Sequence, residues 1–422
     1  MQSAEFTKWL DEYENKGKFK VFLPYSDLKE WIPKNGIYDD ASNSFPLYRL
    51  ADIRALSFLA YIGPTPGKQY MIGFDHTRFD HTLVVALTTE HILKQNEFPK
   101  KDINIGILAA LLHDIAIPAY GDATKSVDPK NLNEEEFWWD VLDENAKKFI
   151  NRHGVDKDRI DEIIKNRGTL GQVLDIADKI TYVMKDLSAI FSYIFMLSEE
   201  EEPPYFLSDL QSILYEDPKI GNIYQDVSFD KDTQEVFFKN PERLKKFLLL
   251  RAILHQKLYI NPISVGRDLF FANLLRPLYS VNSQGLLTPS KLRQMRDQDL
   301  ARHLSEFYRP DFDEWMSAYF GLILWYPGYI QTQDEEEATR YAKELSVEYS
   351  IVGIKRIPGF DPATSYKVRD ANGNNIPFRD FDEKGAAEIE AIERSTRGVF
   401  LFYTDTSSKI ASLLQAAQSK LK

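Results

Sequence analysis

The stretch that decides the fold of this chain is INIGILAALLHD, residues 103–114. Its apolar side chains lie nearly all round a helix, which predicts that the helix is buried on every side. These apolar residues are Ile105, Ile107, Leu108, Leu111 and Leu112. The helix ends in an adjacent imidazole and carboxylate, His113 and Asp114. Histidine is common at helix C-termini, where the helix dipole favours it, so the pair indicates a site only together with other ligands.

Two other stretches supply those ligands. Residues 78–81 read RFDH, and Asp178 lies in the helical stretch 175–182. The combined imidazoles and carboxylates are His81, His113, Asp114 and Asp178. A mixed nitrogen and oxygen set suits a divalent metal such as Mn, Fe, Zn or Mg, and such a metal can polarise a phosphoryl oxygen and activate water. The sequence therefore predicts a metal-dependent phosphohydrolase, with Asp175 as the alternative ligand to Asp178.

The composition of the 422-residue chain bounds its class. Its residues are 43% hydrophobic and 13% aromatic, which is enough for a large core. The net charge of -12 makes nucleic acid an unlikely primary ligand. Cysteine is absent from the sequence, which excludes thiolate metal sites and fits a reducing compartment. Because the sequence shows neither an apolar leader nor a run of membrane-spanning length, we expect a cytoplasmic protein without membrane contact.

The patterning predicts a mainly α-helical fold with a smaller α+β lobe at the C-terminal end. Residues 1–47 are expected to form an N-terminal extension, residues 48–305 the helical core and residues 306–422 a regulatory or oligomerisation lobe.

The predicted elements follow from periodicity and turn residues. Helical patterns occupy residues 47–197, 242–259, 266–279, 289–307, 313–324 and 407–421. Strand patterns occupy residues 349–354 and 398–403. Asn372-Gly373 predicts a hairpin between residues 366–369 and 376–378. The acidic run 199–202, followed by two prolines, predicts a loop.

Six stretches carry a resemblance to a known family and follow the order of its motifs. They are YRLADIRAL at 48–56, RFDHTLVV at 78–85, ALLHDI at 110–115, DKITY at 178–182 followed by Asp186, RAILHQKLY at 251–259 and, more weakly, LRQMRDQDL at 292–300. The chain resembles the HD-domain superfamily, whose motif is H…HD…D. Within it the chain is most similar to deoxynucleoside triphosphate triphosphohydrolases, namely the bacterial dGTPases and the SAM-and-HD-domain dNTPase. The resemblance implies an HD-domain helical core over residues 48–305.

The resemblance also implies roles for the matching residues. It implies that the metal is bound by His81, His113, Asp114 and Asp178. The triphosphate would be contacted by Arg78, Lys179 and Arg251, since guanidinium forks and an ammonium suit phosphate oxygens. Tyr182 would also approach the phosphates.

The same resemblance assigns the sugar and base end of the substrate. Asp186 would accept a hydrogen bond from the 3′-hydroxyl, and Tyr259 would pack where a 2′-hydroxyl would project, which disfavours ribonucleotides. His255 would line the base or sugar pocket. The alternative for Arg251, His255 and Tyr259 is one polar stripe on an ordinary helix.

The chain departs from the family where histidines assist proton transfer. Those histidines correspond here to Ile117, Asp122 and Asn133, and Ala55 stands where the family often has a glutamine that touches the sugar. Asp122 is the candidate general acid or base, on the condition that burial or a neighbouring carboxylate raises its pKa. The other predicted catalytic residues are Arg78 and Asp114.

Two further patterns near the site favour structural roles. Asn133 followed by Glu134, Glu135 and Glu136 predicts an N-cap and an acidic first turn, although a glutamate there could offer a second carboxylate. The remaining histidines lack a partner at ligand spacing and are predicted to be surface or capping residues; they are His76, His91, His153 and His303.

Three hypotheses for the function remain open. The first is an active dNTP triphosphohydrolase, with dGTP among the candidate substrates, acting in nucleotide-pool control or phage defence. The second is a weakened nucleotide-binding sensor that keeps the metal and triphosphate contacts. The third is another HD phosphohydrolase, such as a 5′-nucleotidase or phosphodiesterase. The family resemblance further implies a homo-oligomer, a tetramer or hexamer, and a nucleotide effector whose site the sequence does not place.

Overall fold

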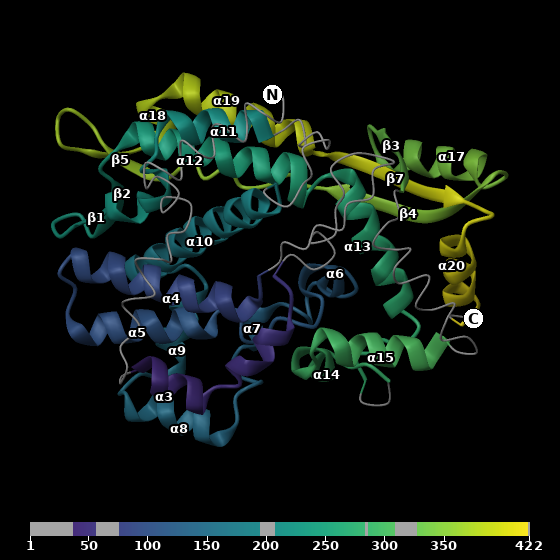
Figure 1. Ribbon diagram of the computed structural model, residues 1–422, viewed down its shortest axis with the longest axis horizontal. Coiled ribbons are helices and arrows are strands. Elements are labelled where there is room, and N and C mark those ends of the chain that lie inside the picture. The colour runs from purple at the N-terminus through teal and green to yellow at the C-terminus, as the bar shows by residue number, and fades with distance from the viewer. Residues whose placement is uncertain (1–36, 56–75, 195–206, 283–285, 309–326, 421–422) are drawn as a thin grey trace.

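The computed structural model describes residues 37–55, 76–194, 207–282, 286–308 and 327–420. The fold is mainly α-helical, with two small sheets in the second half of the chain (Figure 1). This confirms the predicted fold class. The predicted helix at 313–324, the loop at 199–204 and the first 36 residues of the extension lie outside the described residues.

Three helices form the centre of the helical part: α4 (Arg78–Gln95), α5 (Lys100–Leu112) and α10 (Gly168–Ile194). Helix α4 packs against both of the others. Its start is fixed by a capping box, in which the Thr77 hydroxyl accepts from the Asp80 amide and the Asp80 carboxylate accepts from the Thr77 amide. The cap places Arg78 in the first turn of α4, one turn from His81.

Shorter helices surround this centre, and the sequence predicts the N-cap of one of them, α7 (Glu134–Phe137). Asn133 accepts from the Glu135 amide and so confirms the predicted N-cap ahead of the acidic turn. The short helices are α3 (Ile37–Ser44), α6 (Gly121–Lys125), α7 (Glu134–Phe137), α8 (Glu144–Arg152), α9 (Lys157–Ile164) and the 3-10 segment Leu47–Asp52.

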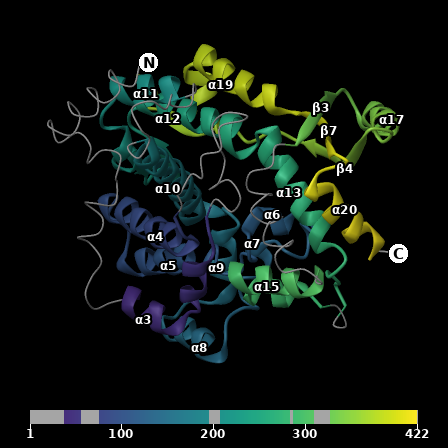
Figure 2. The same cartoon turned by 45° about the vertical axis from the view of Figure 1, so that its right-hand side comes forward.

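The second half of the chain adds further helices, three of which begin at prolines. Asn240, Asn261 and Thr288 cap the helices that follow them, each with a proline in the first turn. These elements are α11 (Leu207–Glu216), α12 (Pro241–Leu254), the π-helical turn His255–Tyr259, α13 (Pro262–Leu275), α14 (Pro289–Gln294) and α15 (Asp297–Tyr308). Figure 2 shows α13 lying between α6 and the three-stranded sheet that is described next.

One sheet has the order β3-β7-β4 and is antiparallel throughout. It contains β3 (Gly328–Thr332), β4 (Tyr349–Ile357) and β7 (Gly398–Asp405), and it contacts α17 (Glu335–Leu345), α13 and α20 (Lys409–Ser419). Strands β4 and β7 and the C-terminal helix α20 fall where the sequence predicts them, whereas β3 was not predicted.

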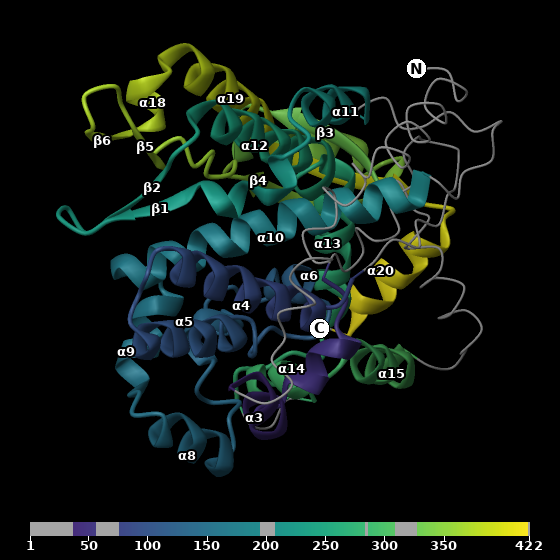
Figure 3. The ribbon, with the colours of Figure 1, turned by 60° about the vertical axis from the view of Figure 1, so that its left-hand side comes forward.

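The other sheet has the order β1-β2-β5-β6 (Figure 3). Its strands are β1 (Val227–Asp230), β2 (Glu235–Phe238), β5 (Lys367–Arg369) and β6 (Asn375–Pro377), and α18 (Phe378–Phe381) and α19 (Glu383–Thr396) follow. The predicted hairpin around Asn372-Gly373 is present as β5 and β6. The hairpin β1–β2 and its parallel pairing to β5 were not predicted.

The segment from β5 to α19 shares the main hydrophobic core, whereas Val352, Phe402 and Ile410 belong to a second cluster. Val368, Phe378 and Ile389 are buried in the same cluster as the central helices. Within the described residues, none of the helices is long and apolar enough to cross a membrane.

Candidate metal centre and substrate pocket

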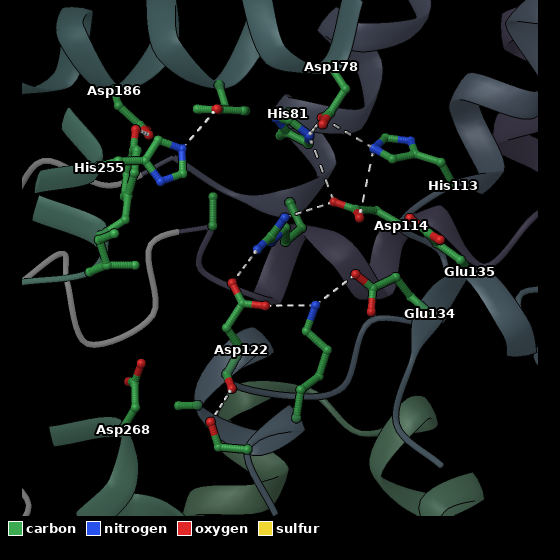
Figure 4. A pocket seen from close by; sticks show the side chains of 18 of the residues that line it. His81, His113, Asp114, Asp122, Glu134, Glu135, Asp178, Asp186, His255 and Asp268 are labelled. Atoms are coloured by element: carbon green, nitrogen blue, oxygen red, sulfur yellow. Dashed lines mark hydrogen bonds and ion pairs between the residues drawn. The ribbon is translucent and has the colours of Figure 1, made fainter. Parts of the chain in front are cut away.

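The residues predicted as metal ligands converge at the meeting of α4, α5 and α10 (Figure 4). The His81 Nε2 atom lies 2.9 Å from Asp178 Oδ1 and 3.8 Å from Asp114 Oδ2. The His113 Nε2 atom lies 3.7 Å from both Asp114 Oδ1 and Asp178 Oδ1. One ligand atom each from His81, His113 and Asp114 fall within 4.8 Å of one another.

The orientation of the His113 ring suits a metal ligand. Its Nδ1 donates to the Ala110 carbonyl at 2.6 Å, which leaves Nε2 as the ring nitrogen that can face a metal. That Nε2 atom is buried and has no hydrogen-bond partner among the described residues. Metal-bound histidines show this arrangement, with a carbonyl fixing the far nitrogen. The residues present therefore fit a divalent metal.

The charged groups of the cluster shift one another's pKa values. Burial alone would lower the pKa of His113, but the Asp114 and Asp178 carboxylates outweigh it and raise the pKa to about 9. Burial opposes ionisation of Asp114, yet His113 and Arg78 lower the pKa of its carboxyl to about 2. Burial likewise opposes ionisation of Asp178, but the neighbouring His113 and His81 imidazoles outweigh it and lower the pKa of the Asp178 carboxyl. Both carboxylates are therefore ionised at neutral pH, as metal ligands must be, whereas His113 has to release its Nε2 proton when a metal binds.

The structure separates Asp178 from its alternative, Asp175. Asp178 faces the histidines, whereas Asp175 binds Lys179 Nζ at 2.5 Å and accepts from the Tyr366 hydroxyl at 2.7 Å. The geometry favours Asp178 as the ligand.

A chain of charges extends from the metal cluster. Arg78 Nη1 donates to Asp114 at 2.9 Å, and Arg78 Nη2 lies 3.9 Å from Asp122. Asp122 in turn pairs with Lys125 at 2.7 Å, and Lys125 pairs with Glu134 at 2.8 Å. The Asp122 side chain is 68% exposed. Lys125, with help from Arg78, lowers the pKa of Asp122, so the condition set for it as a general acid, a raised pKa, is not met.

The opposite end of the pocket gathers the residues predicted to hold the sugar. Tyr259 donates to one oxygen of Asp186, and His76 Nε2 lies 2.7 Å from the other. The Tyr182 hydroxyl lies 3.1 Å from His255 Nε2. The prediction that His76 is a surface or capping residue was wrong. It precedes the Thr77 cap of α4, and its ring is directed at α10 instead of solvent.

A cavity of about 520 Å³ joins the two ends, a size typical of small-molecule sites. Its lining includes Asp122, Asp178, Asp186, His255 and Tyr259 together with the other metal ligands and Arg78. Sequence reasoning missed some of the lining residues, namely His76, Lys125, Asp268 and Lys355. Burial, and then the charge of Asp122, raise the pKa of Asp268 to about 7.

Two of the predicted phosphate-binding residues, Lys179 and Arg251, are not among the described residues that line the cavity. Lys179 is held by Asp175. Arg251 donates from Nε to the Tyr182 hydroxyl and from Nη1 to the Asp361 carbonyl. Their predicted role in binding the triphosphate remains a prediction.

Comparison with known proteins adds the fold but not a family. Neither a family model nor a curated protein matches the sequence. Among solved structures, a hypothetical protein from Aquifex aeolicus matches with a TM-score of 0.61 and 16% identity, over 92% of this chain and 96% of that one. A phosphohydrolase from Bacteroides thetaiotaomicron matches with a TM-score of 0.60 and 16% identity, over 88% of this chain and 96% of its own. This chain thus has the same overall fold as a protein described as a phosphohydrolase.

Proposed function

We propose that the chain is a metal-dependent phosphohydrolase that cleaves deoxynucleoside triphosphates to deoxynucleoside and inorganic triphosphate. The observation that carries the proposal is the convergence of His81, His113, Asp114 and Asp178, in which the buried His113 Nε2 atom has no hydrogen-bond partner from the described part of the chain. The phosphohydrolase among the structural neighbours supports the reaction class, and the sequence resemblance supports the substrate.

Different residues of the pocket would bind the metal and stabilise the charge on the phosphate. His81, His113, Asp114 and Asp178 would hold the metal, which when bound polarises a phosphoryl oxygen and lowers the pKa of water. Arg78, fixed by Asp114, would offset the charge that develops on the phosphate.

The sugar would lie at the other end of the cavity. Asp186, positioned by His76 and Tyr259, would accept a hydrogen bond from the 3′-hydroxyl. The Tyr259 ring would leave little room for a 2′-hydroxyl, and His255 would face the base or sugar. This division favours deoxynucleotides.

One observation favours a second candidate, a 5′-nucleotidase or phosphodiesterase. Lys179 and Arg251 are engaged by neighbouring side chains and backbone and do not line the cavity. A substrate with one phosphate would need only Arg78 and the metal.

The test is product analysis. The purified chain, loaded with Mn²⁺ or Mg²⁺, is incubated with each dNTP, NTP and dNMP, singly and mixed, and products are separated by ion chromatography. Inorganic triphosphate from dNTPs supports the proposal, whereas phosphate from dNMPs alone supports the nucleotidase. Bound but uncleaved nucleotide would instead indicate a sensor. Asp178→Asn, which removes one ligand charge, is the control for contaminating activity.

A further inference from the structure

The segment 358–366 joins β4 to β5. It contacts Arg251 and Lys179, the two predicted phosphate-binding cations that do not line the cavity. Its path is fixed at Gly359, whose φ of +92° is one that residues with a side chain rarely adopt. A Cβ there would also lie 2.1 Å from the Glu393 carboxylate. The course of the segment at this point therefore requires glycine.

Phe360 and Asp361 cover the Arg251 guanidinium. Arg251 donates to the Asp361 carbonyl, and its guanidinium carbon lies 5.8 Å from the centre of the Phe360 ring. Phe360 also stacks on His255, with ring centres 4.5 Å apart and an interplanar angle of 16°. The Arg251 side chain is buried, with 5% of its surface exposed.

Tyr366 contacts the second cation, Lys179, with its ring and contacts the partner of that cation with its hydroxyl. Its hydroxyl donates to Asp175, the carboxylate that pairs with Lys179. The Lys179 ammonium also lies 5.4 Å from the centre of the Tyr366 ring. The 358–366 segment therefore supplies a hydrogen-bond partner of Arg251 and contacts Asp175, the partner of Lys179.

We propose that Phe360 and Tyr366 determine the length of the phosphate chain that the site accepts. The 358–366 segment competes with a triphosphate for Arg251 and Lys179, so a triphosphate binds only by displacing it. A single phosphate would be held by the metal and Arg78 and would not need Arg251 or Lys179, so the segment does not compete with it. The inference rests on the proposed function in taking Lys179 and Arg251 as phosphate ligands.

The competition has a measurable consequence. When the binding-competent form is a minor fraction of the protein, the apparent affinity falls by that fraction. Weakening the segment's contacts should therefore strengthen triphosphate binding and leave phosphate binding unchanged.

The experiment uses the full chain loaded with Mn²⁺ and titrates inorganic triphosphate or inorganic phosphate by calorimetry. Phe360→Ala removes the stack on His255, and Tyr366→Phe removes only the hydroxyl that binds Asp175. We expect Phe360→Ala to bind triphosphate about tenfold more tightly than the parent chain, with phosphate affinity unchanged. Tyr366→Phe should give a smaller gain of the same sign. Phe381→Ala, at a 41% exposed phenylalanine on α18, is the matched control and should change neither affinity.

Adding Arg251→Met to Phe360→Ala should abolish the gain. Equal affinities in parent and variants, an equal change for both ligands, or a gain that survives Arg251→Met would overturn the inference. If Phe360→Ala fails to fold, Tyr366→Phe decides the question with the same readout. Because the titrations need no turnover, a chain that binds triphosphate as predicted but hydrolyses no nucleotide would refute the proposed function alone.

Discussion

At the scale of single residues, His113 is the clearest indication of a bound ligand. Buried polar atoms in folded proteins are almost always paired, yet its Nε2 has no partner among the described residues and points toward Asp114 and Asp178. A cation between these groups would satisfy the nitrogen and both carboxylates at once.

Asp122 is the residue whose role the structure changes most. Because Lys125 and Arg78 keep it ionised, we expect Asp122→Asn to lower kcat by less than about tenfold, whereas loss of a general acid or base costs about 10²–10⁴. Steady-state rates of dNTP hydrolysis, with thermal unfolding as the control for folding, measure this. A loss of a hundredfold or more would restore Asp122 as the proton shuttle.

His76 should act through Asp186 on substrate binding. His76→Phe keeps the ring but removes a hydrogen bond of about 1 kcal/mol, so KM for deoxynucleotides should rise about five- to tenfold with kcat little changed. His153→Phe, at the C-cap of α8, is the control. An unchanged KM, or an effect confined to kcat, would show that His76 does not position Asp186 for the substrate.

The four candidate ligands could be found in the sequence because they lie in short motifs within or directly after helices. It could not find Lys125, Asp268 and Lys355, which reach the pocket from α6, α13 and β4. Their approach depends on how distant elements pack, and periodicity carries no such information. His76 was missed because nothing at helical spacing pairs it with Asp186, 110 residues away.

At the scale of elements, Arg49 ties the loop after the metal pair to the rest of the fold. Its Nη2 donates to the carbonyls of Ile115 at 2.7 Å and Ile117 at 2.8 Å, and its Nη1 donates to the carbonyl of Met295 at 3.0 Å. The side chain is buried, and burial lowers the pKa of its guanidinium to about 10.

Arg49→Met should lower the free energy of unfolding by about 2–4 kcal/mol, because it leaves these carbonyls without a donor. Urea denaturation measures the change. Arg152→Met, at an exposed position on α8, should stay within about 0.5 kcal/mol of the parent chain. Equal stability of the two variants would mean that water replaces the Arg49 contacts.

The elements themselves were predictable where local signals exist, and less so where pairing is long-range. The 289–307 helix divides into α14 and α15 because Met295 is extended, with ψ of 156°. The pairing of β2 with β5 joins Phe238 to Val368 across 130 residues of sequence. Short strands of this kind lack a periodicity long enough to detect.

At the scale of the whole molecule, the assembly is still a prediction. The family resemblance implies a tetramer or hexamer, and the region of the β3-β7-β4 sheet exposes Tyr329 on β3 and Val347 in the turn before β4. Light scattering with and without dNTP should give a mass above that of the 48.9 kDa chain. A monomer under both conditions would contradict this prediction.

The central claim is that a divalent metal joins α4, α5 and α10, and the most direct test is metal content. We would measure tightly bound Mn, Fe, Zn and Mg per chain by plasma mass spectrometry after dialysis, in the parent chain, Asp178→Asn and Asp175→Asn. The account predicts about one ion per chain in the parent and in Asp175→Asn, and a loss of roughly tenfold or more in affinity for Asp178→Asn. Metal retained in Asp178→Asn but lost in Asp175→Asn, or a parent chain that binds none of the four metals when they are supplied, would contradict it.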